Sequence, residues 1–420
     1  METITINKRR INANDRIEKY KKLVSQEWQR ESRLEMIQML IPLGLRAVAE
    51  ELQLEVTELA GNRYSRGKTR KKRWGYNPGS VYLGDQKVSI RVPRVRDVEK
   101  DQEVCLTSYE ALQDARVIDD RIFRQVINGI STQRYERAAE LVPQTFGIKR
   151  DSISQKFIQT AAKKLKACLN RDLSRYDIVA IFMDGKWFGE NSMVVAMGVT
   201  LTGQKIILGF IETSTENHIV CRDFMNSLKD RGLNMSQDIL FIIDGAKGLR
   251  KGIAEVLGAK AVVQRCQWHK RENVVMYLDK KRQPEMRNKL QSAYEQPTYE
   301  AAKKQLDTIK KELKLINESA LHSLEEGLEE TLTLHRLGMF EKIGASFETT
   351  NCIETIMSKL EMYTRRITHW KNSDQRRRWV GAALMEIEPT LRSVRGFGFL
   401  NELRVVMKND TAQIKKQDAA

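Results

Sequence analysis

The spacing of apolar residues along the chain changes near residue 176. Before that point, apolar residues recur at helical intervals over residues 12–60, as at Leu34, Ile37 and Leu40, and residues 118–170 are again typical of helices. After it, runs of consecutive or alternating apolar residues predict strands. A helical N-terminal part and an α/β part suit the two or three domains that 420 residues allow.

The segment from Asp177 to Gln264 predicts one mixed sheet. Its elements follow in the order strand, strand, strand, helix, strand, helix, strand. The predicted strands are 177–183, 193–199, 205–212, 238–243 and 260–264, and the predicted helices are 217–228 and 248–257. Hairpin strands followed by crossover helices give a mixed sheet with helices on its faces. This α/β order is that of an RNase H-like domain.

Two apolar strands of this sheet each end in Asp-Gly, at Asp184-Gly185 and at Asp244-Gly245. Open α/β sheets bind ligands beyond the carboxyl ends of their strands. If the two strands are parallel neighbours, roughly 4.8 Å apart, the aspartates can share one or two divalent cations such as Mg²⁺. The alternative is that each Asp-Gly only makes a turn. Its presence after both strands favours a functional site.

A third acid follows a long helical stretch. Residues 272–340 have the amphipathic spacing of an inserted helical bundle, and Thr349–Glu354 then opens another helix. Asn351 and Glu354 are spaced like a capping box, which stabilises a helix start without any catalysis. The two roles are compatible, because a glutamate in the first turn is held rigidly. Glu348 is the competing acid, less suitable because it precedes the predicted helix.

The charge of the chain favours a polyanionic partner. Lys and Arg number 72 against 55 Asp and Glu, a net charge of +17. Twelve of these cations lie between residues 61 and 100, where the alternating runs 80–83 and 87–92 predict a hairpin flanked by Tyr64, Trp74, Tyr76 and Tyr82. Such a surface suits phosphates and stacked bases. The alternative is a solvated charge run beside a small hairpin.

A helix-turn-helix is predicted between the hairpin and the sheet. A short helix at 136–141, a tight turn at Gly147 and a longer helix running to about Leu169 match its outline, whose second helix enters a major groove. Any two helices joined through a glycine look similar, so this motif alone leaves an ordinary helix pair open.

Together these motifs resemble the Mutator-type transposases of bacterial insertion sequences, a branch of the DDE enzymes with an RNase H-like core. The resemblance covers about residues 60–380. The segments that carry it are Met183–Gly185, Ile242–Gly245, Cys266-Gln-Trp-His269, Thr349–Glu354, the basic region from Arg63 to Arg96, and Asn128–Ser131. The run around Trp370 and Arg376–Arg378 does not match the family pattern, so contacts made there stay open.

The resemblance implies DNA strand cleavage and strand transfer at the terminal inverted repeats of a transposon. Asp184, Asp244 and Glu354 are the implied catalytic residues and the ligands of two Mg²⁺ or Mn²⁺ ions. The implied partners are double-stranded DNA, as transposon ends and target, and a second copy of the chain, giving a homodimer or higher oligomer. The residues expected to contact DNA are Arg63, Arg66, Lys68, Arg70, Lys71, Lys72, Arg73, Arg94, Arg96, Lys149, Arg150, Trp268, His269, Arg365 and Arg366.

Two of these expectations have open alternatives. Cys266 and His269 supply only two of the four ligands of a zinc site, so a structural or DNA-positioning role for Trp268 and His269 is favoured over zinc. Arg365 and Arg366 either meet phosphates or form a solvated basic face.

The chain is expected to divide into seven segments. These are N-terminal helices (1–60), a basic hairpin (61–104), the helix-turn-helix (105–172), the first part of the catalytic core (173–270), the helical insertion (271–345), the second part of the core (346–400) and a tail (401–420). No apolar run approaches the roughly 18 residues of a membrane span, and Met1–Asn14 is unlike a signal peptide. Five scattered cysteines favour a reducing compartment. The predicted location is cytoplasmic and nucleoid-associated.

Three other classes of DNA-acting protein are alternatives to this interpretation. A tyrosine recombinase needs a nucleophilic tyrosine after its Arg/His cluster, and no tyrosine follows Tyr363. An RNase H-fold nuclease without joining activity uses the same acids. A helix-turn-helix regulator without catalysis needs none of them, so three intact acids argue against it.

Overall fold

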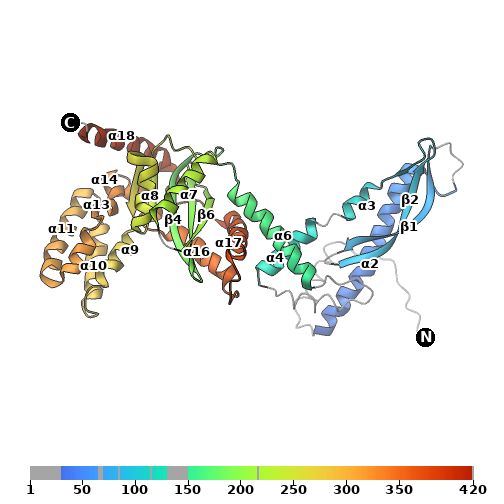
Figure 1. Ribbon diagram of the computed structural model, residues 1–420, viewed down its shortest axis with the longest axis horizontal. Coiled ribbons are helices and arrows are strands. Elements are labelled where there is room, and N and C mark those ends of the chain that lie inside the picture. Colours follow the sequence, from blue (N-terminus) through green and yellow to red (C-terminus); the bar gives the residue numbers. More distant parts are fainter. Residues whose placement is uncertain are drawn as a thin grey trace, which may run out of the picture. The chain divides into compact units, whose positions relative to one another are not determined.

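The computed structural model describes residues 30–64, 70–83, 86–113, 116–129, 150–214 and 217–418 (Figure 1). The chain forms two compact units, Met1–Phe157 and Ile158–Ala420. Within the ranges given, no helix is both long and apolar enough to cross a membrane.

The N-terminal unit is a helix packed on a small antiparallel sheet. Helix α2 (Arg30–Ala60) is followed by β1 (Lys71–Leu83), β2 (Gln86–Asp97) and β3 (Gln102–Val104), in the order β1-β2-β3. Val48, Leu52 and Val56 of α2 pack against Val81 and Val95 of the sheet. The predicted hairpin is confirmed, but β1 and β2 are longer than expected, because the basic residues 71–73 pair with residues 95–97.

The described residues that follow include the helices α3 (Thr107–Leu112), α4 (Arg116–Ile127) and α6 (Arg150–Leu169). Phe123 of α4 stacks on Phe157 of α6 with ring centroids 5.6 Å apart. Lys156 also pairs with Asp119 at 2.5 Å, so α4 packs on the first turns of α6. The predicted long helix to Leu169 is confirmed. The short helix at 136–141 and the turn at Gly147 lie outside the described residues.

The C-terminal unit is built on a five-stranded mixed sheet. The strands are β4 (Ile178–Phe188), β5 (Asn191–Thr200), β6 (Lys205–Thr213), β7 (Ile239–Ile243) and β8 (Ala261–Arg265). Their order is β6-β5-β4-β7-β8; β4 pairs antiparallel with β5 and parallel with β7. Helices α7 (His218–Asp230) and α8 (Lys247–Leu257) contribute to the core on one face (Figure 1). The predicted mixed α/β sheet and its order of elements are confirmed.

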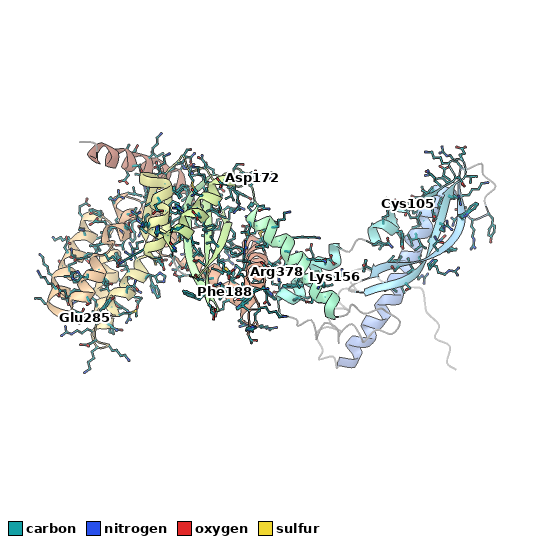
Figure 2. All side chains as sticks on the ribbon, in the orientation of Figure 1. Cys105, Lys156, Asp172, Phe188, Glu285 and Arg378 are labelled. Atoms are coloured by element: carbon teal, nitrogen blue, oxygen red, sulfur yellow. The ribbon has the colours of Figure 1, made fainter. Side chains whose placement is uncertain are left out.

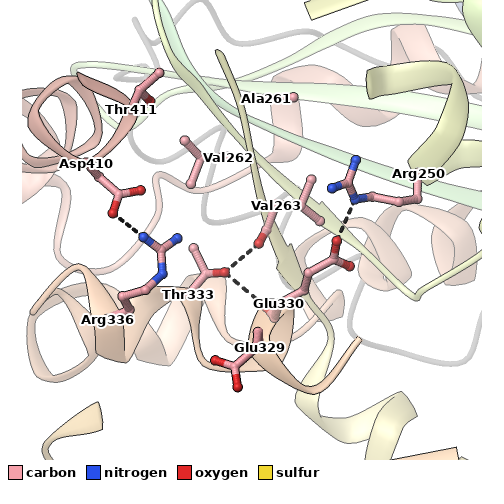
Figure 3. Close-up of a pocket in the computed structure, with 10 residues that line it drawn as sticks. All are labelled: Arg250, Ala261, Val262, Val263, Glu329, Glu330, Thr333, Arg336, Asp410 and Thr411. Carbon is pink, nitrogen blue, oxygen red and sulfur yellow. Dashed lines mark hydrogen bonds and ion pairs between the residues drawn. The ribbon is translucent and has the colours of Figure 1, made fainter. Parts of the chain in front are cut away.

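The segment after the sheet is helical, as expected. It contains α9 (Gln267–Val275), α10 (Gln283–Tyr294), α11 (Tyr299–Ile316), α12 (Glu318–Glu325), α13 (Leu328–Thr331) and α14 (Thr333–Arg336). Leu290, Leu306 and Leu324 lie in its separate core. This bundle also covers the outer edge of β8, where the Thr333 hydroxyl donates a hydrogen bond of 2.6 Å to the Val263 carbonyl (Figure 3).

The chain then returns to the sheet through α15 (Phe340–Phe347), α16 (Asn351–Thr364) and α17 (Ser373–Ile387). Phe188, at the end of β4 (Figure 2), packs edge-on against Trp370 in the loop between α16 and α17. The segment expected as a tail is largely helix α18 (Leu400–Asp418). It is anchored by buried Leu403 and Met407 and by the pair of Arg404 with Asp177.

Candidate active site beside β4 and the end of β7

Asp184 lies in β4, and Asp244 directly follows the neighbouring parallel strand β7. Met183 and Ile243 form the last residue pair of the parallel β4–β7 ladder, and each aspartate comes next in its chain. The Gly185 N–H donates a 2.8 Å hydrogen bond to Asp184 Oδ1, and the Ala246 N–H donates a 2.9 Å bond to Asp244 Oδ1. The expected neighbourhood of the two acids is therefore confirmed.

The strand end expected at Asp184-Gly185 is wrong, and so is the alternative that this pair only makes a turn. Strand β4 continues to Phe188, because β5 still pairs with it after β7 has ended; Asp184 lies opposite Val195. Asp184 is therefore held inside a strand, which restrains it more than a turn does. At Asp244 the strand does end, and Gly245 adopts a positive φ of 106°.

Asp184 lies on the face of the sheet opposite α7 and α8. Ile181 and Met183 are in the core that includes α7 and α8, whereas Phe182 packs against Phe347 of α15. Successive side chains on a strand alternate between faces, so Asp184 shares the face of Phe182. Helix α16, which carries Glu354 in its first turn, contacts β4.

The charges of the three acids act on one another. Burial, the largest cause, and the negative charges of Asp244 and, less strongly, Glu354 together raise the pKa of Asp184 to about 6. The nearby His269 lowers it. Asp184 and Asp244 are 60 positions apart in the sequence, and Asp244 and Glu354 are 110 positions apart. The charges of Asp244 and Glu354 nevertheless both act on Asp184, as expected of carboxylates that share a cation site.

The start of α16 differs from the predicted capping box. The residue before the helix is Thr350, not Asn351, and its side chain makes no capping bond to the backbone. Instead, the Thr350 hydroxyl donates a hydrogen bond of 2.5 Å to Glu354 Oε1. The capping box is therefore wrong, and the threonine orients the carboxylate. Sequence reasoning missed this role of Thr350, although the Thr-Thr-Asn triplet marked its position.

The competing acid Glu348 has different surroundings. It ends helix α15, and its pKa is raised by burial and by the charge of Glu295, which follows α10. Neither Asp184 nor Asp244 contributes to that shift. Glu354 is thus the acid that shares the environment of the two aspartates.

Cys266 and His269 belong to the same network. The Cys266 sulfur accepts a hydrogen bond from the His269 backbone N–H (3.5 Å) and lies 3.4 Å from the Thr350 hydroxyl oxygen. Interaction with Cys266, together with the charges of Glu354, 3.9 Å from its Nδ1, and of Asp244, raises the pKa of His269 to about 9 despite burial. A positively charged imidazole therefore lies beside the acids. The neighbours of Cys266 and His269 are Thr350 and Glu354, not a second Cys/His pair.

The chemistry of the three carboxylates fits hard divalent cations. Mg²⁺ and Mn²⁺ prefer oxygen ligands, and a bound cation relieves the repulsion that raises the pKa of Asp184. In the part of the chain that is described, no three His, Cys, Asp or Glu side chains already stand at the spacing of metal ligands. Binding would therefore require the acid side chains to draw closer together.

Comparison with known proteins places these residues in a family. A family model described as "Transposase, Mutator family" matches residues 17–392. The chain belongs to the Mutator family of transposases. This confirms the resemblance seen in the sequence motifs.

Individual relatives of this Mutator-family transposase are distant. It is 24% identical over 359 residues to the transposase for insertion sequence element IS256 in transposon Tn4001 of Staphylococcus aureus, covering 80% of this chain and 85% of the relative. It is 24% identical over 382 residues to the transposase for ISRM5 of Rhizobium meliloti (strain 1021), covering 86% and 92%. With the transposase for IS1081 of Mycobacterium tuberculosis it shares 27% over 263 residues, covering 60% of each.

Several basic residues of the transposase that were expected to bind DNA are engaged within the N-terminal unit. Arg73 donates to Gln53 Oε1 (3.0 Å), Thr57 Oγ1 (2.8 Å) and the Gly61 carbonyl (3.1 Å), which ties β1 to the end of α2. Three others form ion pairs: Arg70 with Asp97, Arg94 with Glu103 and Arg96 with Asp101. Sequence spacing alone did not separate these anchors from the remaining cations.

Other expected DNA contacts are exposed. Lys72 is exposed and Lys71 half-buried, and Arg63 lies over the ring of Tyr64 at 5.6 Å. The Arg96 guanidinium lies 5.2 Å from the ring of half-exposed Trp74. Exposed positions elsewhere in the transposase are Trp268, at the start of α9, and Arg365 and Arg366, at the end of α16. Arg66, Lys68 and Lys149 and the side chain of Arg150 lie outside the described residues.

Arg73 and Lys72 are adjacent in β1 and make a matched pair for mutagenesis. Arg73→Ala removes the hydrogen bonds to α2 and should destabilise the N-terminal unit by about 2 kcal/mol. Lys72→Ala should leave stability unchanged, weaken binding to transposon-end DNA and reduce the slope of log affinity against log salt by about 1. Thermal unfolding and DNA binding at several salt concentrations measure both. Unaltered DNA binding by the Lys72 variant would contradict its assignment as a phosphate contact.

Proposed function

We propose that this transposase binds the terminal inverted repeats of an insertion sequence and catalyses cleavage and strand transfer of DNA with two divalent metal ions. Asp184, Asp244 and Glu354 would be the catalytic residues and the metal ligands. The observation that carries the proposal is the coupling of these acids beside β4 and the end of β7, where the pKa of Asp184 responds to both other charges.

The sheet supports an RNase H-like catalytic core. Its order β6-β5-β4-β7-β8, with an antiparallel hairpin side and a parallel side, agrees with the strand and helix order expected for that fold. The helical segment α9–α14 interrupts the core between the second and third acids. This arrangement suits an enzyme whose insertion contributes to DNA binding, more than it suits a small nuclease.

The chain's own residues would prepare the acids for their ligands. The backbone amides of Gly185 and Ala246 each bind one oxygen of an aspartate, and the described residues make no hydrogen bond to the second oxygen. Thr350 restrains Glu354. When bound, Mg²⁺ or Mn²⁺ would activate the attacking hydroxyl and stabilise the leaving oxygen in an in-line displacement at phosphorus.

The DNA substrate would be held mainly by basic residues. The exposed Arg63 and Lys72, the helix-turn-helix region and the pair Arg365 and Arg366 are proposed to contact phosphates. Trp268 and His269, whose rings meet edge to face at 4.9 Å, are proposed to position DNA beside the acids. Since two transposon ends must be brought together, we propose a homodimer or higher oligomer, acting on chromosomal DNA in the cytoplasm and nucleoid.

The test is incubation of the full chain with DNA carrying the ends of its own element and Mg²⁺, followed by mapping of nicks and joined products. We expect nicks at the element's ends and strand-transfer products, both abolished by EDTA. Asp184→Asn should lose both while binding the ends normally. Nicks without joined products would indicate a nuclease. Binding without any Mg²⁺-dependent nick would indicate a regulator, and one chain per pair of ends would contradict the dimer.

A further inference from the structure

Arg265, the last residue of β8, lies between the sheet and the helical insertion. Its side chain is buried, and its guanidinium makes two hydrogen bonds to backbone carbonyls. Nη2 donates to the Gly245 carbonyl at 3.0 Å, and Nη1 donates to the Glu326 carbonyl at 2.9 Å. One side chain therefore joins the loop that follows Asp244 to the turn between α12 and α13.

Two glycines make room for this guanidinium. A Cβ atom at Gly245 would lie 1.9 Å from Arg265 Nε, and one at Gly327 would lie 2.3 Å from Nη1. Both glycines also have positive φ, 106° and 65°, which other residues rarely adopt. The guanidinium is thus enclosed between two backbone segments that only glycine allows to approach so closely.

The arrangement is not the one that would maximise stability. Arg265 Nε is buried without a hydrogen-bond partner, and an unsatisfied buried N–H costs about 1–3 kcal/mol. Lys270, which is almost fully buried, adds a second positive charge by donating to the Ser323 and Glu326 carbonyls at 2.6 Å each. The Glu326 carboxylate, 3.9 Å from Arg265 Nη2, supplies a counter-charge, so the unpartnered Nε–H is the part of this arrangement that lowers stability.

The contact reaches the candidate catalytic acid through one peptide group. The Gly245 carbonyl, which accepts from Arg265, belongs to the same planar peptide as the Ala246 N–H, which donates to Asp244 Oδ1 at 2.9 Å. Rotation of that peptide would break both bonds together. The Glu326 carboxylate also pairs with Lys247 at 3.1 Å, at the first residue of α8, so the insertion holds the loop at two points.

We propose that Arg265 is a positioning residue for the transposition reaction: it holds the Gly245–Ala246 peptide so that Asp244 is oriented for its metal ion, and it makes that orientation depend on the insertion turn at Glu326–Gly327. This inference rests on the proposed function, because it assigns Asp244 to the metal site. A displacement of the insertion turn would thereby alter the Asp244 carboxylate without any contact between the insertion and the ion.

Arg265→Lys is the decisive variant, and Arg250→Ala is its matched control. A lysine keeps the charge but cannot span the two carbonyls with one planar group. Arg250 pairs with Glu330 at 2.5 Å and so also links α8 to the insertion, without touching Gly245 (Figure 3). We expect Arg265→Lys to bind end DNA normally, to cleave roughly 10–100-fold more slowly and to need about tenfold more Mg²⁺ for half-maximal rate. Arg250→Ala should stay within about twofold of the unmodified protein on both measures.

Hydrogen–deuterium exchange of the apo protein gives a readout independent of catalysis. Faster exchange of the peptide spanning residues 244–248 in Arg265→Lys, and not in Arg250→Ala, is expected. Gly327→Ala, which displaces the guanidinium from the other side, should reproduce the effect if the lysine variant fails to fold. Equal exchange and an unchanged Mg²⁺ requirement would overturn the inference and leave the proposed function standing. If the unmodified chain shows no Mg²⁺-dependent cleavage, the proposed function fails, and selective exchange at 244–248 still decides whether Arg265 holds the loop.

Discussion

Replacement of Glu354 by glutamine is expected to lower the rate of DNA cleavage at the transposon ends at least about 1000-fold, equivalent to roughly 4 kcal/mol of barrier. The variant keeps the shape of the side chain and can still accept the Thr350 hydrogen bond. It loses the negative charge that a divalent cation requires, so the loss should appear in catalysis and in metal dependence and not in DNA binding. Single-turnover cleavage of end DNA over a range of Mg²⁺ concentrations measures it.

Glu348→Gln is the matched control for this prediction. Glu348 lies six residues before Glu354, and the charge that affects it is that of Glu295. Its variant should cleave within about threefold of the unmodified transposase, the range expected for a residue outside the reacting groups. If the two variants had exchanged phenotypes, Glu348 would be the third acid, and the assignment of α16 to the active site would be wrong.

Asp184→Asn is expected to stabilise the metal-free C-terminal unit at neutral pH while abolishing its activity. The pKa of Asp184 is raised from 3.8 to about 6 by burial and by the neighbouring charges. A carboxyl group with a raised pKa contributes stability that is present below its unfolded value and lost as the pH rises through the folded value. Above pH 6 the ionised side chain therefore opposes folding, and a neutral amide removes that penalty.

The size of this effect follows from the same shift. Two pKa units correspond to an upper limit of about 3 kcal/mol, so at pH 7.5 in EDTA the variant should unfold at higher urea, and near pH 4 the gain should vanish. Millimolar Mg²⁺ should reduce the difference by stabilising the unmodified protein through binding. Asp172→Asn is the control: the pKa of exposed Asp172 is lowered by hydrogen bonds from Ser174, so its variant should show no gain at pH 7.5. If the Asp184→Asn variant were less stable than the unmodified protein at neutral pH, the raised pKa of Asp184 would be contradicted.

Several elements of the fold could be predicted because short-range patterns of apolar residues specify them. The runs ending at Met183 and Ile243 are apolar at every position and short, which is typical of strands buried on both faces. The insertion was predicted from helical periodicity that persists over many turns. In the N-terminal unit the hairpin was predicted from alternation, and its extension over residues 71–79 was missed, because the basic side chains of residues 71–73 conceal the pairing with β2.

The surroundings of the candidate acids and of Arg73 depend on contacts between segments that are distant in the sequence. Whether Asp184 ends a strand or lies within one is decided by β5, whose pairing continues past the end of β7. Whether Asn351 caps α16 is decided by Thr350, which binds the glutamate instead of the backbone. In sequence Arg73 cannot be told from its basic neighbours. In the fold, α2 and the residue that follows it supply three hydrogen-bond acceptors to its guanidinium.

By itself, the sequence determined the mixed sheet, the helical insertion, the three candidate acids and the family, because each is encoded in local periodicity or in short motifs. Only the tertiary structure decided which acid accompanies the aspartates, which cations are anchors and how Arg265 reaches the loop after Asp244. The physical reason is that burial, charge coupling and hydrogen-bond partners arise between residues tens of positions apart, and no pattern within one segment records them.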